Sequence, residues 1–238
     1  MTIRKAAEHE RSNLITMEMS DKTIVDLKQM LTAAQEEFDL AVTFHEIWKP
    51  AAYDQDLHNR LGNSYATQAF LVTRTALRRE MVLALVRLWD TNKEGVRMEL
   101  IWHHLRNANV IDALAQDRAD RLGFSDVLEY MREDFAGKAE SAIKLIAKYM
   151  EGGPHNNVLK TLRALRHRRL AHRQASLATA PGASATDEEI EEFYQDNSKL
   201  IHLLLGLVSA VAYDPQATAG VFGFYAKSFW ERFQPART

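Results

Sequence analysis

The sequence predicts an all-α protein, an antiparallel bundle of long helices with additional shorter ones. Apolar residues recur at helical spacing through most of the 238 residues, and strand-like alternation is hard to find. Hydrophobic residues make up 46% of the chain, which is enough for a substantial core. The segments between the periodic stretches are mostly short, and short connections favour antiparallel neighbours.

The first half of the chain predicts two long helices and then shorter ones. Pro50 is expected to end the first helix, because proline disrupts a helix interior. The second helix follows Gly62 and is expected to stop near residues 90–92, and shorter helices should lie between Val96 and Arg121. The apolar stripes of the two long helices are Leu27, Leu31, Ala34, Phe38 and Val42, and Phe70, Leu77, Met81, Leu85 and Leu88.

The second half predicts three further helices. One fills residues 125–150 and ends at the Gly-Gly-Pro sequence of residues 152–154. The next begins at about His155. Beyond the small, polar loop SLATAPGASA, residues 186–189 form a capping box that starts the third helix, which Pro215 is expected to end. The apolar stripe of that third helix is Ile190, Phe193, Ile201, Leu204, Val208 and Val211.

The sequence contains no repeat and no clear domain boundary. We therefore expect an N-terminal extension over residues 1–19, one helical domain over residues 20–212, and an aromatic-rich helical tail over residues 213–238 that packs on the same domain.

Composition excludes several classes of protein and site. The chain has no cysteine, which excludes disulfides, thiolate metal sites and a cysteine nucleophile. His45-Glu46 begins like a zinc-protease motif, but Lys49 occupies the place of the second histidine. The apolar stretch 200–213 is too short to span a membrane, and the polar N-terminus does not resemble a secretory signal. We expect a cytoplasmic protein with no metal, no cofactor and no membrane partner.

The most distinctive segment is a basic run from Lys160 to Arg173. It holds six Lys or Arg and two His with no acidic residue, so the rest of the chain carries a formal charge of −8, that is, −2 minus +6. Such clustering predicts a local anion site, and phosphate is the natural ligand of arginine. The basic residues are Lys160, Arg163, Arg166, Arg168, Arg169 and Arg173, and the histidines are His167 and His172.

Helix geometry adds a constraint on this run. Val158, Leu162 and Leu165 form an apolar stripe, which continues at helical spacing to Arg169 and His172. An apolar stripe that turns into Arg and His must enter a polar cavity, a partner interface or a carboxylate pair, because an unpaired buried charge is too costly. The competing interpretation is a solvated basic face with one core histidine.

Two further residues bear on this geometry. Arg166 lies roughly 120° around a straight helix from His172, so the two converge only if the helix bends or ends there, or if two protomers contribute. Asp90 follows the apolar pair Leu88-Trp89 and is expected to cap the helix end or turn. It is also placed to pair with an arginine of the basic run.

Residues 166–172 resemble the Arg-polar-x(3–5)-His signature of the HEPN superfamily (higher eukaryotes and prokaryotes nucleotide-binding). The sequence LRALRHRRLAHR resembles the abortive-infection, AbiU-like branch in particular. The stretch 79–90 and the short helix expected over residues 96–105 are similar to the same branch. The resemblance covers residues 20–212.

The resemblance implies a helical bundle that dimerises with the two signature helices face to face, and in many members a metal-independent endoribonuclease. His172 would then be the general acid or base, Arg166 would stabilise the phosphorane, and His167 would orient the site. The family usually has Asn or Asp at position 167. The RNA- and phosphate-binding residues would be Arg163, Arg168, Arg169 and Arg173.

Three hypotheses follow. The first is an endoribonuclease of a phage-defence or toxin–antitoxin system, which cleaves RNA through attack of the 2′-hydroxyl and has RNA, a second copy and a cognate antitoxin as partners. The second is a non-catalytic HEPN dimer that binds RNA, a nucleotide or an acidic partner through the basic patch of residues 160–173. The third is a structural dimer whose basic run pairs with carboxylates across the interface.

Overall fold

The computed structural model describes the backbone of residues 2–62, 65–123, 125–170 and 185–232. Side chains are described over residues 22–62, 65–123, 126–166 and 185–232. Within these ranges the chain is helical, and the only β-structure there is an isolated bridge between Trp89 and Arg97. The predicted all-α fold class is confirmed.

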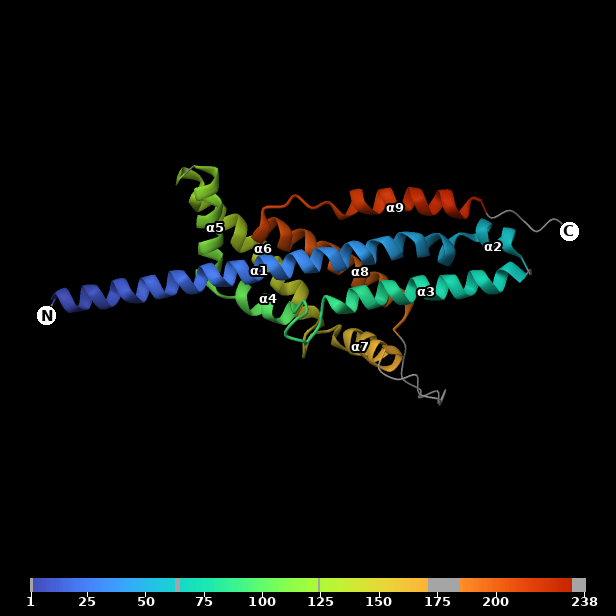
Figure 1. Ribbon diagram of the computed structural model, residues 1–238, viewed down its shortest axis with the longest axis horizontal. Coiled ribbons are helices and arrows are strands. Elements are labelled where there is room, and N and C mark those ends of the chain that lie inside the picture. The colour runs from blue at the N-terminus through green and yellow to red at the C-terminus, as the bar shows by residue number, and fades with distance from the viewer. Residues whose placement is uncertain (1, 63–64, 124, 171–184, 233–238) are drawn as a thin grey trace.

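Four helices form the long axis of the molecule (Figure 1). The helix α1 (Thr2–Tyr53) runs the length of the bundle, and the short α2 (Gln55–Leu61) turns the chain into α3 (Tyr65–Arg87), which packs antiparallel to α1. The last helix, α9 (Pro215–Trp230), also packs along α1.

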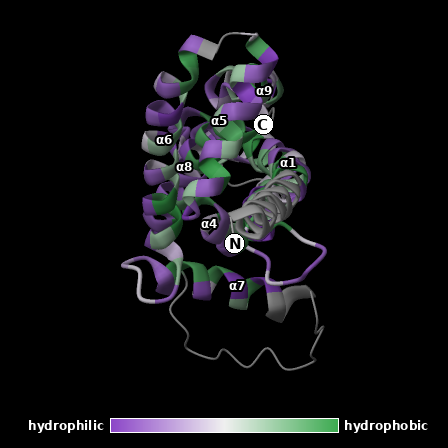
Figure 2. Ribbon diagram, turned by 90° about the vertical axis from the view of Figure 1, so that its left-hand side faces the viewer, coloured by the Kyte–Doolittle hydropathy of each residue, from purple (hydrophilic) through white to green (hydrophobic). Residues whose placement is uncertain are grey.

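The remaining helices cover one side of this layer. They are α4 (Met98–Leu105), α5 (Ala108–Leu122), α6 (Leu128–Tyr149) after a 3₁₀ turn (Ser125–Val127), α7 (Asn156–Leu170) and α8 (Asp187–Leu204). The helix α6 contacts α4, α5, α7 and α8, and α8 also contacts α1, so these helices share one core. Figure 2 shows α7 at the lower edge of the bundle.

The predicted apolar stripes form the core, except that Val211 was wrongly included: it lies beyond the end of the helical turn at Ser209 and is 41% exposed. Every residue of the α1 stripe is fully buried, as are Met81, Leu85 and Leu88 of the second stripe. The capping box at the start of α8 is present, because Thr186 Oγ1 accepts from the Glu189 amide and Glu189 Oε2 accepts from the Thr186 amide. None of the helices in the described ranges is long and apolar enough to cross a membrane.

Both proline predictions are wrong. Pro50 lies inside the last turn of α1, which continues to Tyr53, and the Pro50 carbonyl accepts from the Asp54 amide. A proline in a last turn removes one hydrogen bond but leaves the turns before it intact. Pro215 begins α9 rather than ending the helix before it, and Asp214 caps that start. The first helical position suits proline, because its amide would have no partner within the helix.

The end of α8 widens into one π-helical turn (Leu205–Ser209), after which Ala210 adopts a left-handed conformation with φ of 59°. Arg118 of α5 donates from Nη2 to the carbonyls of Gly206 and Leu207, at 3.1 and 3.4 Å. The guanidinium also lies over the ring of Phe135, 5.2 Å from its centroid. Arg118 therefore satisfies carbonyls that the wide turn leaves open.

Candidate functional site

The helix α7 carries the basic run and packs on α3 and α6 through an apolar stripe. Val158 and Leu162 are buried and Leu165 packs partly buried against the core, as the spacing predicts. Leu159 is buried as well. The apolar side of α7 is therefore fixed to the bundle, and the arginines flank it.

Arg166 forms an ion pair with Asp90. Its Nη2 lies 2.8 Å from Asp90 Oδ2, and the two side chains are 26% and 21% exposed. Asp90 was expected to cap a turn or to pair with an arginine of the basic run, and it does both. Its Oδ1 accepts from the backbone amides of Thr91 and Asn92, at 2.7 and 3.2 Å.

Arg163, one helical turn before Arg166, is bound to the same turn of the chain. Its Nη2 donates to the carbonyl of Trp89, the residue before Asp90. Burial lowers the pKa of Arg163, although the nearby carboxylates of Asp90 and Glu99 oppose this change. Two arginines of α7 thus hold one two-residue segment, 89–90.

Residues 89–90 are held from their other side by α8 and by the strand-like bridge. The indole Nε1 of Trp89 donates to Oδ1 of Asn197 at 2.9 Å, and Asn197 is fully buried. The Asp90 amide donates to the Val96 carbonyl at 3.0 Å. The position of Arg166 therefore depends on a chain of contacts that begins in α8.

The predicted site residues fall into three groups. Arg163 and Arg166 are described and lie together on α7. His167, Arg168 and Arg169 lie in the helical backbone of α7, but their side chains are outside the described residues. His172 and Arg173 are outside the described residues altogether. The convergence of Arg166 and His172 therefore stays a prediction.

A cavity of about 460 Å³ lies beside the basic run, between α4, the end of α6 and α7. Arg163 and Lys160 line it from α7, and Trp102 and His103 line it from α4. It adjoins residues 89–90, so Arg163 lies between this cavity and the turn that holds Arg166. No cluster of three or more His, Asp or Glu suited to a metal ion occurs in the part of the chain that the structure describes.

A second titratable cluster, which the sequence analysis missed, joins α1 to α8. His45 is 1% exposed, and its Nδ1 and Nε2 lie 2.9 and 2.8 Å from carboxylate oxygens of Glu46 and Glu191. The imidazole stacks on Tyr194 with 3.9 Å between ring centroids. The sequence did contain one signal for this cluster. Position 45 follows Val42 by three residues, and this helical spacing places His45 on the buried face of α1.

The comparison with known families agrees with this architecture. The family model described as AbiU2, of the HEPN group, matches residues 24–229. The chain belongs to the HEPN AbiU2 family. This membership confirms the resemblance drawn from residues 166–172 and supports a function of the abortive-infection type. The match extends into α9, so this helix is part of the AbiU2 region. No curated protein and no solved structure matches the chain.

Replacing Asp90 with asparagine tests the Arg166 contact. Asparagine keeps an acceptor for the Thr91 and Asn92 amides but loses the charge, so the free energy of unfolding should fall by about 1 kcal/mol at pH 7. Burial alone would raise the pKa of Asp90, but the hydrogen bonds from Arg166 and the two amides hold it below 3.8. A depressed pKa stabilises the fold above pH 3.8, and this contribution is lost as the pH falls through the lower, folded-state value.

Urea unfolding of wild type and Asp90→Asn at several pH values checks this prediction. The difference between them should be constant near neutrality and should shrink below pH 3.8. Glu94→Gln, an exposed change in the same turn, is the matched control. A wild type and an Asp90→Asn variant of equal stability at pH 7 would contradict the role given to this ion pair.

Proposed function

We propose that this AbiU2-family protein is a metal-independent endoribonuclease of a phage-defence or toxin–antitoxin system. The observation that carries the proposal is the ion pair that positions Arg166 on a basic helix, whose sequence resembles the Arg-polar-x(3–5)-His signature of the HEPN superfamily. Asp90 holds the guanidinium through Nη2. Arginine has five N–H donors, so others remain to contact a phosphate.

In the proposed reaction, the ribose 2′-hydroxyl of the RNA attacks the adjacent phosphorus and loses its proton to a base. The bond to the 5′-oxygen of the next nucleotide breaks, and that oxygen takes up a proton. The products are a 2′,3′-cyclic phosphate and a free 5′-hydroxyl. His172 is the proposed acid or base, because a histidine titrates near neutral pH. Arg166 stabilises the negative charge that develops on the phosphorane.

The remaining basic residues have a binding role in this proposal. Arg168, Arg169 and Arg173 contact the RNA backbone, and His167 orients the site. Arg163 is partly committed to the Trp89 carbonyl, so its main contribution is to place Arg166. A second copy of the chain would bring two such helices together, as the family resemblance implies.

The test is cleavage of a mixed RNA pool by purified wild type in the presence of a chelator. We expect fragments with 2′,3′-cyclic phosphate ends, and we expect His172→Ala to lose this activity at least 100-fold, about the contribution of a general acid or base. His104→Ala, which removes the neighbouring histidine of α4 that does not line the cavity beside the basic run, is the matched control and should cleave normally. Normal cleavage by His172→Ala would refute the assignment of the acid or base.

A second candidate function is a non-catalytic module that binds RNA, a nucleotide or an acidic partner through the same patch. The intramolecular pairing of Arg166 with Asp90 favours it, because an ion-paired arginine can be a structural element alone. This candidate predicts intact RNA in the cleavage assay together with binding that weakens steeply as salt rises. Binding insensitive to salt and to Arg168→Ala would exclude it.

A further inference from the structure

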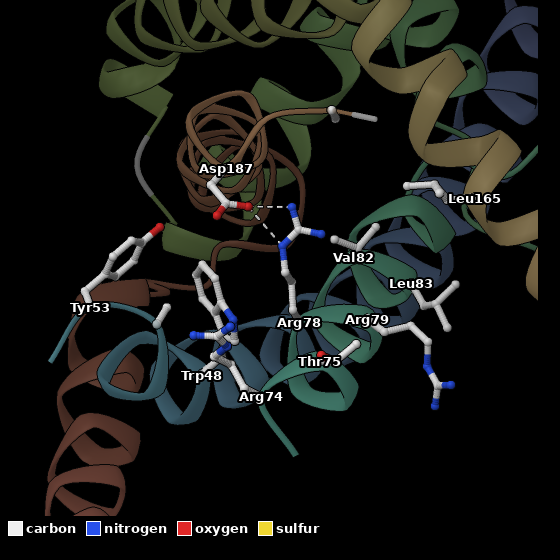
Figure 3. Close-up of a pocket in the computed structure, with 12 residues that line it drawn as sticks. Trp48, Tyr53, Arg74, Thr75, Arg78, Arg79, Val82, Leu83, Leu165 and Asp187 are labelled. Carbon is white, nitrogen blue, oxygen red and sulfur yellow. Dashed lines mark hydrogen bonds and ion pairs between the residues drawn. The ribbon is translucent and has the colours of Figure 1, made fainter. Parts of the chain in front are cut away.

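A second cavity, of about 390 Å³, shares no lining residue with the first (Figure 3). Residues of α1, α3 and α7 and the start of α8 form its walls. Leu165 is its one described contact with the basic run, and neither Arg163 nor Arg166 lines it. The two described arginines of the site proposed for RNA cleavage are therefore not part of this cavity.

The polar groups of this cavity are mainly cationic. Arg78 is held in place by Asp187, because its Nε and Nη2 lie 3.0 and 2.5 Å from the same carboxylate oxygen. This leaves Nη1 of a fixed guanidinium for another acceptor. Arg74, one turn earlier on α3, lies 5.9 Å from the Phe70 ring centroid and forms no ion pair with any residue that the structure describes. The positive charge of the arginines that line the cavity thus exceeds the single negative charge of Asp187, so the lining is positively charged overall.

The other walls are apolar and partly aromatic. Trp48 forms the floor, and Tyr53 meets its ring edge to face with 5.4 Å between centroids. Val82, Leu83 and Leu165 line the opposite side. In Figure 3, Arg74 lies beside the Trp48 ring and Arg78 extends from α3 to Asp187, whereas Arg79, which also lines the cavity, points away from both. Arg79 instead pairs with the neighbouring Glu80.

We propose that this cavity binds a small organic anion: a planar apolar body of about one or two rings against the exposed ring of Tyr53 and the edge of the buried Trp48, with a carboxylate, sulfonate or phosphate at Arg74 and Arg78. Apolar walls with a few convergent polar groups are typical of small-ligand sites. Planar guanidinium groups match oxyanions by paired hydrogen bonds. The same chemistry occurs in a free small molecule and in the terminal nucleotide of an RNA strand. The proposal does not rest on the nuclease function.

Fluorescence titration with 8-anilinonaphthalene-1-sulfonate, an aromatic sulfonate, tests the site directly. Excitation of tryptophan should transfer energy to the bound probe, because Trp48 forms the floor of the cavity. We expect Arg74→Ala and Arg78→Ala each to weaken binding about tenfold, the effect of losing one charge-assisted hydrogen bond. Arg121→Ala removes the same charge from an exposed position of α5 that does not line the cavity, and its affinity should stay within about twofold of wild type.

Thr75→Trp provides a second variant that leaves all charges in place. Thr75 is exposed at the cavity lining, so a large ring there should block the probe while the protein stays folded. His172→Ala should bind the probe as wild type does, which separates this site from the nuclease. Equal probe affinity in wild type, Arg74→Ala and Thr75→Trp would overturn the proposal and would place the probe elsewhere, as on the exposed aromatic residues of α9.

Competition then identifies the source of the anion. Displacement of the probe by salicylate or adenosine monophosphate, but not by a single-stranded RNA oligonucleotide, supports a free small molecule. Displacement by the oligonucleotide at low concentration, lost in Arg78→Ala, supports the end of an RNA strand. Failure of all three competitors at millimolar concentration counts against the proposal.

Discussion

Replacing His45 with alanine should lower the free energy of unfolding by about 2 kcal/mol at pH 6, because it leaves two carboxylates of the α1–α8 contact without their shared partner. His45 is 1% exposed and lies within 2.9 Å of both Glu46 and Glu191. A doubly protonated imidazole donates to both carboxylates at once. His45 is buried and the Glu46 side chain is 14% exposed, but the Glu191 side chain is 38% exposed, so solvent screens its share of the interaction and the expected loss is smaller than for a fully buried pair.

This contribution depends on pH with a defined sign. Burial alone would lower the pKa of His45, but the hydrogen bonds to Glu191 and Glu46 together raise it above 6.5. A raised pKa stabilises the fold fully below pH 6.5, and the stabilisation is lost as the pH rises through the folded-state value. The pKa of Glu191 is lowered, chiefly by its hydrogen bond from His45, so its own contribution is lost only as the pH falls below 4.5.

Urea unfolding between pH 5.5 and 9 measures both effects. The difference between wild type and His45→Ala should be largest at the acidic end and should shrink above pH 6.5. His45→Gln keeps hydrogen-bonding capacity without a titrating ring, so its stability should change less across this range. His103→Gln, at an exposed position of α4, is the control. A His45→Ala deficit that is constant across the range would show that only packing is lost.

The second large effect is expected at Asn197. Asn197→Leu removes the acceptor of the Trp89 indole N–H inside the core, and a buried donor left without a partner costs about 1–3 kcal/mol. Asn197 also donates to the Phe193 carbonyl at 2.7 Å, which is lost as well. We expect a total loss of about 3 kcal/mol in the free energy of unfolding.

A double-mutant cycle with Trp89→Phe isolates the Trp89–Asn197 hydrogen bond. Because each single change leaves one buried polar group without its partner, the double variant should be more stable than the sum of the two losses predicts, by about 1 kcal/mol or more. Strict additivity of the two losses would contradict the proposed coupling. If the protein cleaves RNA, Asn197→Leu should also slow cleavage, since Trp89 and Asp90 hold Arg163 and Arg166.

The sequence predicted the helices well where one physical signal dominates. The buried stripe of α1, the break at residues 152–154 and the capping box of α8 each depend on a local pattern, and each is present. Pro50 and Pro215 were misjudged because a proline is tolerated in a last or first turn, and the sequence does not reveal which turn a proline occupies.

The candidate site was predictable only in part. A family signature and a cluster of charge identified α7, and Asp90 was recognised as a suitable partner for one of its arginines. The contacts of Arg163 with the Trp89 carbonyl and of Asn197 with the Trp89 ring link positions 74 and 108 residues apart. Helical periodicity gives the buried side of each helix but not the neighbour that it faces.

The contact of Arg118 with the end of α8 has a consequence for local motion. A helix end normally frays by itself, because its last carbonyls have no partner within the helix. Here two carbonyls of the π-helical turn are bound by a side chain from α5, 88 and 89 positions earlier in the chain. The amides of residues 205–211 should therefore exchange with solvent deuterium only as fast as α5 separates from the bundle, and the two segments open as one cooperative unit.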